Sequence, residues 1–307
     1  MNKNEIEKLV SLRLDGLTWD KIAESFPQFS SNALRKAFYR FIRKDEQSEV
    51  RKKTKSRDKT HVVIPDCQVK SGVDISYLSA IGNYVAKKKP DVIVCIGDFA
   101  DMPSLSSYDV GKKSFEGRRY KKDVEATIEG MTLLMAPIAA EMERDPSWRP
   151  ELHLTLGNHE ERIYRAINND PKLDGTMSMD DLEYESFGWK VHDYLVPVVI
   201  DGIAYAHFFT SGAMGKPVSS ASALVKKKHQ SAVMGHAQDW SIHREIKADG
   251  TSIIGLFVGA CYLHNEDYLG AQGNNYGRQL WVLHEVDGTG SFLPKPVSLK
   301  YLIEKYS

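Results

Sequence analysis

The sequence predicts a mixed α/β protein, in which two sheets pack as a sandwich flanked by helices and a small all-α domain comes first. Three observations lead to this prediction. Residues 1–44 place apolar side chains at helical spacing. From residue 61 to about residue 160, short apolar strands alternate with helical stretches, which is typical of an α/β core. After residue 190, short strands separated by turns dominate, and these can supply a second sheet.

The first 44 residues are expected to form three short helices. Helical spacing covers residues 4–14, and Thr18 is a suitable N-cap for a second helix that begins at Trp19. Residues 32–44 form an amphipathic stretch with a basic polar side. A tight turn before a basic third helix indicates a trihelical helix-turn-helix, similar to the homeodomain-like modules of resolvases and phage regulators. A three-helix bundle that contacts protein is the alternative.

A basic linker is expected at residues 45–60, because this stretch is polar and lacks apolar periodicity, and the main domain then covers residues 61–307. Residues 1–60 hold 15 Lys and Arg against 9 Asp and Glu, whereas the rest of the chain holds 26 against 32. A basic N-terminal segment indicates binding to a polyanion, and an acidic main domain indicates binding of cations. The alternative is that the lysine-rich linker serves solubility alone. Nucleic acid, DNA in particular, is therefore the expected partner. The basic residues expected to contact it are Arg35, Lys36, Arg40, Arg43, Arg51, Lys52 and Lys53.

The cysteine content argues against a disulfide-stabilised protein. Cys67, Cys95 and Cys261 are an odd number, with no CxxC spacing, so reduced thiols are expected. The first residues lack the apolar run of a signal peptide, and no stretch reaches the length of a membrane span. A cytoplasmic location is the expectation.

The main domain is expected to begin with strands that alternate with helices and to continue with shorter strands. The first strands are expected at residues 61–65, 91–96 and 152–156, with helices at 75–88 and 118–143 and a further helix after Gly157. The later strands are expected at residues 196–200, 203–207, 232–234, 241–246, 252–259 and 279–286.

Polar side chains follow these strands at the points where they end. Carboxyl ends of strands in α/β sheets face a common crevice, so side chains far apart in the sequence can meet there. Carboxylate, amide and imidazole groups together are a metal-binding set. The residues in question are Asp66, Gln68, Asp98, Asn158, His159, His207, His236 and Gln238.

Taken in chain order, these residues form the series DxQ, GD, GNHE, H and GHxQ. The series resembles the pattern DxH, GD, GNH, H and GHxH of the calcineurin-like metallophosphoesterase superfamily, over about residues 60–286. The stretch GDFADMPSLSSYD further resembles a phage-borne branch of that superfamily. This resemblance implies the metallophosphoesterase version of the sandwich fold and, for a phage protein, the cytoplasm of a bacterial host.

The resemblance also implies two divalent metal ions, with Asp98 as the bridging ligand. The first ion would be held by Asp66, Gln68, Asp98 and Gln238. The second would be held by Asp98, Asn158, His207 and His236. Glutamine replaces both family histidines of the first site, which makes that site all-oxygen. Mn²⁺ fits both sites best, with Mg²⁺, Fe²⁺ or Zn²⁺ as further possibilities, and loss of the first site is the alternative.

The implied activity is metal-dependent hydrolysis of a phosphate ester. A hydroxide shared by the two ions attacks phosphorus, and His159 occupies the family position that protonates the leaving group, so Asp98, Asn158 and His159 are the expected catalytic residues. Arg162 is either a phosphate clamp or a surface arginine. We expect a nuclease that acts on DNA positioned by the helix-turn-helix. The alternatives are a phosphomonoesterase or nucleotide phosphatase that processes nucleic-acid ends, and a non-catalytic DNA-binding protein with a degraded metal site.

Overall fold

The computed structural model describes residues 1–14, 17–31, 33–38, 58–107, 110–266, 273–274 and 276–307. The chain divides into two compact units, Met1–Arg57 and Asp58–Ser307.

The N-terminal unit contains helices α1 (Lys3–Leu14) and α2 (Trp19–Glu24), and residues 33–38 are also helical. Thr18 precedes α2 at the expected N-cap position, but its side chain makes no capping hydrogen bond. The helix-turn-helix remains a prediction for this unit. Among the described residues of this unit, Leu9, Ile22, Phe26, Leu34 and Phe38 form a small buried core.

The basic residues predicted to contact nucleic acid fall mostly outside the described part of the chain. Lys36 is exposed and Arg35 is half-buried in the helical residues 33–38. Arg40, Arg43, Arg51, Lys52 and Lys53 lie outside the described residues, as does nearly all of the predicted linker.

The first sheet of the larger unit has six strands in the order β13-β12-β1-β2-β3-β4. Strands β1 to β4 are parallel, and β12 and β13 extend the sheet in antiparallel fashion. The first strand starts at Lys59, so the predicted linker, which ran to residue 60, was two residues too long. The strands are β1 (Lys59–Ile64), β2 (Val92–Cys95), β3 (Glu151–Thr155), β4 (Lys190–His192), β12 (Gln279–Val286) and β13 (Leu293–Ser298).

The second sheet has five strands in the order β10-β11-β9-β6-β5. At its centre β9 is parallel to both β6 and β11. The strands are β5 (Val198–Ile200), β6 (Ile203–Tyr205), β9 (Ala232–Met234), β10 (Trp240–Ile246) and β11 (Ser252–Val258), and a separate ribbon is formed by β7 (Thr210–Ser211) and β8 (Lys216–Pro217).

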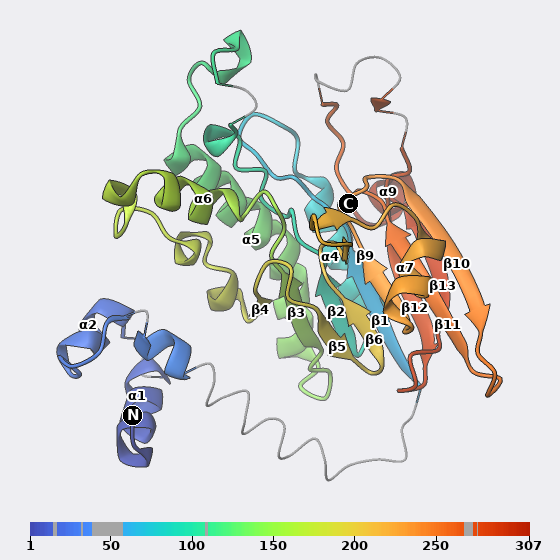
Figure 1. The fold of residues 1–307 in the computed structure, drawn as a ribbon, viewed down its shortest axis with the longest axis horizontal. Coiled ribbons are helices and arrows are strands. Elements are labelled where there is room, and N and C mark those ends of the chain that lie inside the picture. The colour runs from blue at the N-terminus through green and yellow to red at the C-terminus, as the bar shows by residue number, and fades with distance from the viewer. Residues whose placement is uncertain (15–16, 32, 39–57, 108–109, 267–272, 275) are drawn as a thin grey trace. The chain divides into compact units, whose positions relative to one another are not determined.

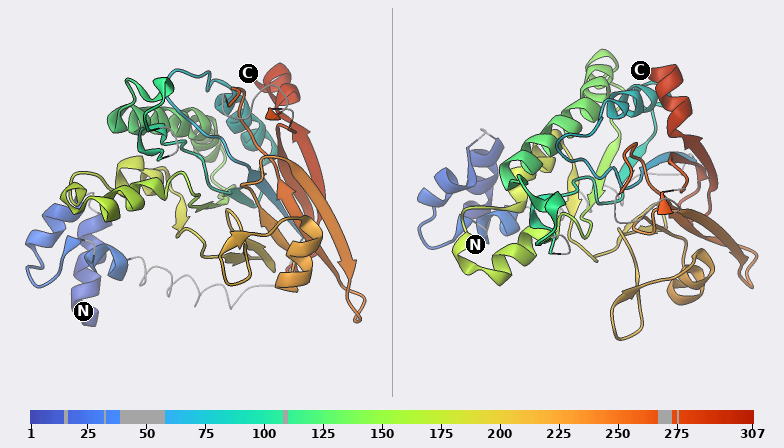
Figure 2. Two further views of the ribbon diagram at one scale, coloured as in Figure 1. Left: turned by 45° about the horizontal axis from the view of Figure 1, so that its top comes forward. Right: turned by 90° about the horizontal axis from the view of Figure 1, so that it is seen from above.

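A shared apolar core joins the two sheets. Val63 and Val94 of the first sheet belong to the same buried cluster as Tyr205, Val233 and Leu256 of the second. Helices cover the outer faces, with α4, α5 and α9 on the first sheet and α7 on the second (Figures 1 and 2). The larger unit is thus a mixed α/β structure with two main sheets, compatible with the predicted sandwich. The helices are α4 (Tyr77–Lys88), α5 (Tyr120–Arg144), α6 (Arg162–Asn169), α7 (Ala221–Lys228) and α9 (Leu299–Tyr306), with 3-10 turns at Pro103–Leu105, Lys113–Phe115, Pro171–Leu173, Met179–Leu182 and Tyr184–Phe187.

None of the helices in the described part of the chain is both long enough and apolar enough to cross a membrane. The three cysteines, Cys67, Cys95 and Cys261, are buried and unpaired.

The topology brings the polar strand ends to one side of the unit. Because β1, β2 and β3 are parallel, their carboxyl ends open onto the same edge of the first sheet. The carboxyl ends of β6 and β9 lie side by side in the second sheet for the same reason. The loops after these five strands carry the predicted metal ligands.

Candidate metal centre

Four side chains from four different strand ends meet at one point. Asp98 follows β2, Asn158 follows β3, His207 follows β6 and His236 follows β9. Oδ1 of Asn158 lies 3.0 Å from Nε2 of His207 and 2.8 Å from Nδ1 of His236, and Nε2 of His207 lies 3.2 Å from Oδ2 of Asp98. Two ligands at right angles, each about 2.1 Å from an ion, are roughly 3 Å apart. The four groups therefore have the spacing of a coordination sphere, and Asp98, His207 and His236 form a group that can hold a metal ion.

His207 is oriented by the backbone beneath it. Its imidazole is buried, and its Nδ1 donates a hydrogen bond of 3.0 Å to the carbonyl oxygen of Ile96. That bond leaves Nε2 directed at Asp98 and Asn158. A hydrogen bond from the other ring nitrogen to a backbone carbonyl fixes the ring orientation of histidine ligands in metal proteins.

The opposite charges of His207 and Asp98 shift the pKa values of both groups. Burial lowers the pKa of His207, but the charge of Asp98 and the hydrogen bond to it outweigh burial and raise the pKa to about 10. Burial raises the pKa of Asp98, but His159 and His207 outweigh it and hold that pKa below its ordinary value. Burial and the charge of His207 lower the pKa of His236 to about 4. A metal ion binding here must displace the proton on His207.

Asp66 and Gln68 supply the first test of the site predicted for the first ion. Both side chains are buried, and neither Oδ2 of Asp66 nor Nε2 of Gln68 has a hydrogen-bond partner among the described residues. Buried polar atoms nearly always have one, so these two atoms indicate a missing polar ligand. The amide of Gln68 presents its oxygen at the same place after a half-turn of its terminal bond. Asp66 and Gln68 therefore fit a cation, and burial raises the pKa of Asp66 to about 7 without one.

Gln238, the remaining ligand predicted for the first ion, is half-buried and already has a partner. Its Oε1 accepts a hydrogen bond of 2.8 Å from the hydroxyl of Tyr262, which in turn accepts one from Tyr276. An amide oxygen has two lone pairs, so one remains for a metal ion while Tyr262 fixes the direction of the side chain. Gln238 is therefore oriented by Tyr262 and Tyr276, neither of which belongs to the sequence motif.

The loops that carry the ligands have an uncommon backbone. Gln68, Asp98, His236 and Gln238 have φ angles of 43°, 48°, 66° and 58°. Positive φ is uncommon for residues other than glycine, and such strain gathers at functional sites.

Two glycines of the motifs make room for the acidic ligands. A Cβ atom on Gly157 would lie 2.1 Å from Oδ1 of Asp98, and one on Gly235 would lie 2.4 Å from Oδ1 of Asp66. The carboxylates therefore pack directly against the backbone of the neighbouring loops, where only glycine leaves enough space.

Glu160 holds two of the loops together, a role that the sequence analysis missed. Its buried carboxylate accepts hydrogen bonds from the backbone amides of Asp98, Ala100 and Gly157, at 2.9 to 3.0 Å, and one of 3.2 Å from the hydroxyl of Tyr184. The loops after β2 and β3 are therefore fixed to one side chain. The acid was visible as the last letter of GNHE, but its partners depend on the fold.

His159 lies at the edge of the centre, between two acids. Its Nδ1 is 2.8 Å from Oδ1 of Asp101, and its Nε2 is 3.7 Å from Oδ2 of Asp98. Burial lowers the pKa of His159, but Asp98 and Asp101 outweigh it and raise the pKa. Arg162 donates hydrogen bonds to the backbone carbonyls of Asp101 and Met102, and its Nη2 lies 3.1 Å from Nε2 of His159. The predicted phosphate clamp is thus held beside His159.

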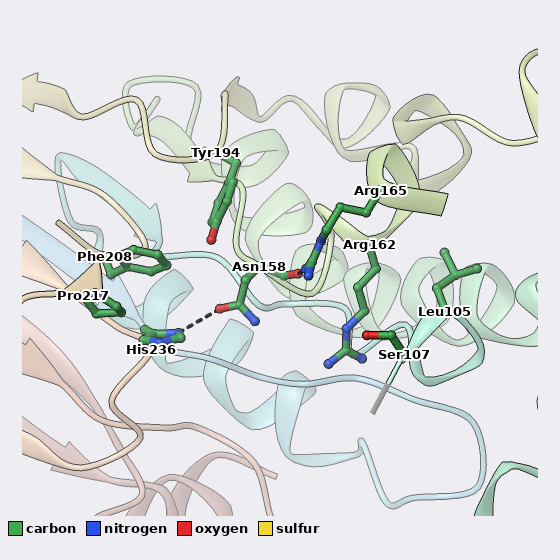
Figure 3. A pocket seen from close by; sticks show the side chains of 9 residues that line it. All are labelled: Leu105, Ser107, Asn158, Arg162, Arg165, Tyr194, Phe208, Pro217 and His236. Atoms are coloured by element: carbon green, nitrogen blue, oxygen red, sulfur yellow. Dashed lines mark hydrogen bonds between the residues drawn. The ribbon is translucent and has the colours of Figure 1, made fainter. Parts of the chain in front are cut away.

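A cavity of about 280 Å³ lies beside the metal-binding group. Asn158 and His236 form part of its wall, and Figure 3 shows two arginines and an aromatic cluster around them. Arg165, Tyr194 and Phe208 were not predicted as site residues. The lining residues are Leu105, Ser107, Asn158, Arg162, Arg165, Tyr194, Phe208, Pro217 and His236.

A second group of potential ligands consists of Asp101, His264 and Glu266. Lys70 already lies among them, with its Nζ 2.9 Å from Oδ2 of Asp101 and 2.7 Å from Oε1 of Glu266. Burial lowers the pKa of Lys70, but the two carboxylates raise it further, so the ammonium stays charged. We therefore assign this group to an ion-pair network and not to a metal centre.

Comparison with protein-family models gives no match for the chain, and none of the curated proteins matches it. Functional inference therefore depends on the site geometry and on the resemblance of the motifs.

Proposed function

We propose that this chain is a metal-dependent phosphoesterase of the calcineurin-like type, which hydrolyses phosphodiester bonds in nucleic acid, and in DNA in particular. The observation that carries the proposal is the convergence of Asp98, Asn158, His207 and His236 at the spacing of a coordination sphere, next to a cavity. Structural metal sites are closed by protein ligands, whereas catalytic sites keep an open side for water and substrate. The cavity beside these residues therefore supports a catalytic metal site over a structural one.

Two divalent ions, with Mn²⁺ preferred, are the proposed cofactors. His207, His236, Asn158 and Asp98 would hold one ion, which suits Mn²⁺, Fe²⁺ or Zn²⁺ because imidazole nitrogen and oxygen ligands are mixed. Asp98 would also contact the other ion together with three residues that offer oxygen atoms, which favours Mg²⁺ or Mn²⁺. These three are Asp66, Gln68 and Gln238. When bound, the ions supply water activation near neutral pH and stabilise charge on the phosphate oxygens.

His159 is the proposed proton donor to the leaving group. In the hydrolysis, a water molecule loses one proton to solvent and its oxygen bonds to phosphorus. The bond between phosphorus and the leaving oxygen breaks, and that oxygen takes a proton from Nε2 of His159, which solvent then restores. Asp101 supports this role, because its hydrogen bond to Nδ1 orients the ring and favours the protonated form. Nη2 of Arg162 lies 3.1 Å from the same nitrogen, and because arginine only donates, this contact belongs to the state in which Nε2 has no proton.

The N-terminal unit is the proposed nucleic-acid reader. Residues 1–60 carry an excess of six positive charges, and Lys36 is exposed on a helical segment. Lysine and arginine contacts to phosphates supply most of the non-specific affinity for DNA. The unit would keep a polynucleotide close to the hydrolytic site, and a helix-turn-helix arrangement is proposed for it.

The proposal is tested with the purified full-length chain and Mn²⁺ on end-labelled single- and double-stranded DNA, with the products resolved by size. Bis-p-nitrophenyl phosphate and p-nitrophenyl phosphate are run in parallel. We expect shortened DNA and faster turnover of the diester. Release of the terminal phosphate alone, with faster turnover of the monoester, would assign the chain to end-processing phosphatases. If correctly folded, Mn²⁺-loaded protein hydrolyses none of these substrates, the chain is a non-catalytic binding protein.

A further inference from the structure

Two arginines of α6 reach the cavity beside the metal centre, but they differ in their partners. The guanidinium of Arg162 is occupied by the carbonyl oxygens of Asp101 and Met102 and by His159. Arg165, one turn further along, is exposed and donates a hydrogen bond to the backbone oxygen of Asn158. Arg165 interacts electrostatically with Glu161, one turn earlier, but forms no ion pair with a carboxylate in the described part of the chain. The remaining N–H groups of Arg165 therefore place a positive charge next to Asn158, a proposed metal ligand. Such a charge can bind a phosphate group.

Aromatic rings form the opposite wall. The rings of Tyr194 and Phe208 meet edge to face, with centroids 5.8 Å apart, and Phe208 also lies against His236 at 4.7 Å. Tyr194 is half-buried, and Figure 3 shows its ring reaching towards Asn158 between Phe208 and Arg165. An aromatic ring beside an arginine is the combination with which proteins bind unpaired nucleotides, because the base stacks on the ring while the cation holds the backbone phosphate.

The cavity is small. Its volume of about 280 Å³ lies near the lower end of the range of ligand pockets in proteins, which is about 300–1,000 Å³. A base that is paired in a duplex must leave its partner before it can reach such a pocket. The cavity therefore favours a substrate whose bases are already unpaired.

We infer that the cavity binds an unpaired nucleotide next to the scissile phosphate, with the adjacent phosphate against Arg165 and the base against Tyr194. The inference rests on the proposed phosphodiesterase function, and it narrows the substrate to single-stranded polynucleotide. Because neither group reads the edge of a base, binding is tolerant of base sequence.

The test compares two substrates with Mn²⁺, a single-stranded oligonucleotide, as DNA and as RNA, and bis-p-nitrophenyl phosphate, which has no adjacent nucleotide. The variants are Arg165→Gln and Tyr194→Leu. We expect the ratio of kcat/KM for the oligonucleotide to kcat/KM for the small diester to fall about tenfold in each, since a charge-assisted contact or a stacked base is lost. Tyr194→Phe keeps the ring, and Arg244→Gln removes an exposed arginine of β10, so both controls should keep the ratio within about twofold.

A ratio that stays constant in Arg165→Gln and Tyr194→Leu, or falls equally in Arg244→Gln, would overturn the inference while the phosphodiesterase proposal stands. If the wild-type protein hydrolyses neither substrate, the phosphodiesterase proposal fails, and fluorescence anisotropy then decides on the cavity. We expect the full-length protein to bind a labelled single strand more weakly after Arg165→Gln, with a salt slope smaller by about 0.7. Equal affinity and slope in wild type and variant would overturn the inference by this route as well.

Discussion

Nε2 of His207 lies 3.2 Å from Oδ2 of Asp98, and both side chains are buried. The short distance explains why the pKa of His207 rises to about 10 while that of Asp98 falls. One proton on the imidazole balances a carboxylate that would otherwise be an uncompensated buried charge. The same two atoms can hold a metal ion, so a proton and a cation compete for this place.

This competition predicts that metal binding becomes tighter as the pH rises. Because His207 keeps its proton up to a pH of about 10 in the metal-free protein, the tighter ion must displace about one proton at any lower pH. The apparent affinity for Mn²⁺ should therefore rise about tenfold per pH unit between pH 7 and pH 9. Calorimetry in buffers of different ionisation enthalpy measures the protons released. Binding without proton release would show that the imidazole is already neutral.

Glu160 should contribute to stability as well as to the shape of the site. In Glu160→Gln, an NH₂ group would face backbone amides that now donate to a carboxylate, so at least one buried donor loses its acceptor. We expect the free energy of unfolding to fall by about 2–4 kcal/mol and the melting temperature to fall with it. Glu125→Gln, on an exposed face of α5, is the matched control and should change the free energy by less than about 0.5 kcal/mol. Equal stability of both variants would contradict the role given to Glu160.

Removal of the N-terminal unit should separate binding from hydrolysis. Deleting residues 1–57 leaves the larger unit, which starts at Asp58, complete. We expect normal turnover of bis-p-nitrophenyl phosphate but weaker binding to DNA and a shallower dependence of binding on salt, because phosphate contacts are lost. Fluorescence anisotropy across a salt series measures both quantities. An unchanged salt slope would favour the protein-contact alternative for this unit.

The two glutamines should control which metals the protein accepts. With Gln68 and Gln238 as oxygen ligands, the first site should be the weaker one and should prefer Mg²⁺ or Mn²⁺. Replacing both with histidine should tighten the weaker of two binding events and extend activity to Zn²⁺, Co²⁺ or Ni²⁺. Calorimetry on metal-free protein, with activity measured against metal concentration, tests this. A single binding event in the wild type, with full activity at one equivalent, would contradict the two-ion arrangement.

The strands and helices that could be predicted are those with a clear apolar pattern. β2 is a run of four buried apolar residues, and its position follows from the sequence alone. β4 and β13 were missed because they lie at the two edges of the first sheet, where β4 has only three residues and most of β13, including both prolines, is not fully buried. Edge strands of this kind carry little apolar periodicity.

The metal ligands could be predicted from the sequence, whereas the other residues of the cavity could not. Each of the four ligands lies two or three residues after a strand, so their meeting could be anticipated from the parallel order of those strands. These ligands are Asp98, Asn158, His207 and His236. Arg165 and Tyr194 lie seven and thirty-six residues beyond Asn158, and only the fold brings them to the same cavity. No local pattern marks either residue, because an arginine on a helix and a tyrosine in a loop are ordinary features of a protein surface.

The most direct measurement of the central claim is Mn²⁺-dependent hydrolysis of bis-p-nitrophenyl phosphate by the wild type and by Asp98→Ala and His236→Ala, with circular dichroism confirming the fold of each. His284→Ala, an exposed histidine on β12, is the matched control. We expect the first two variants to retain less than about 1% of wild-type activity, because each loses a ligand of the proposed metal centre, whereas His284→Ala remains fully active. Wild-type activity that does not depend on a divalent metal, or that survives in Asp98→Ala, would contradict the proposed metal centre.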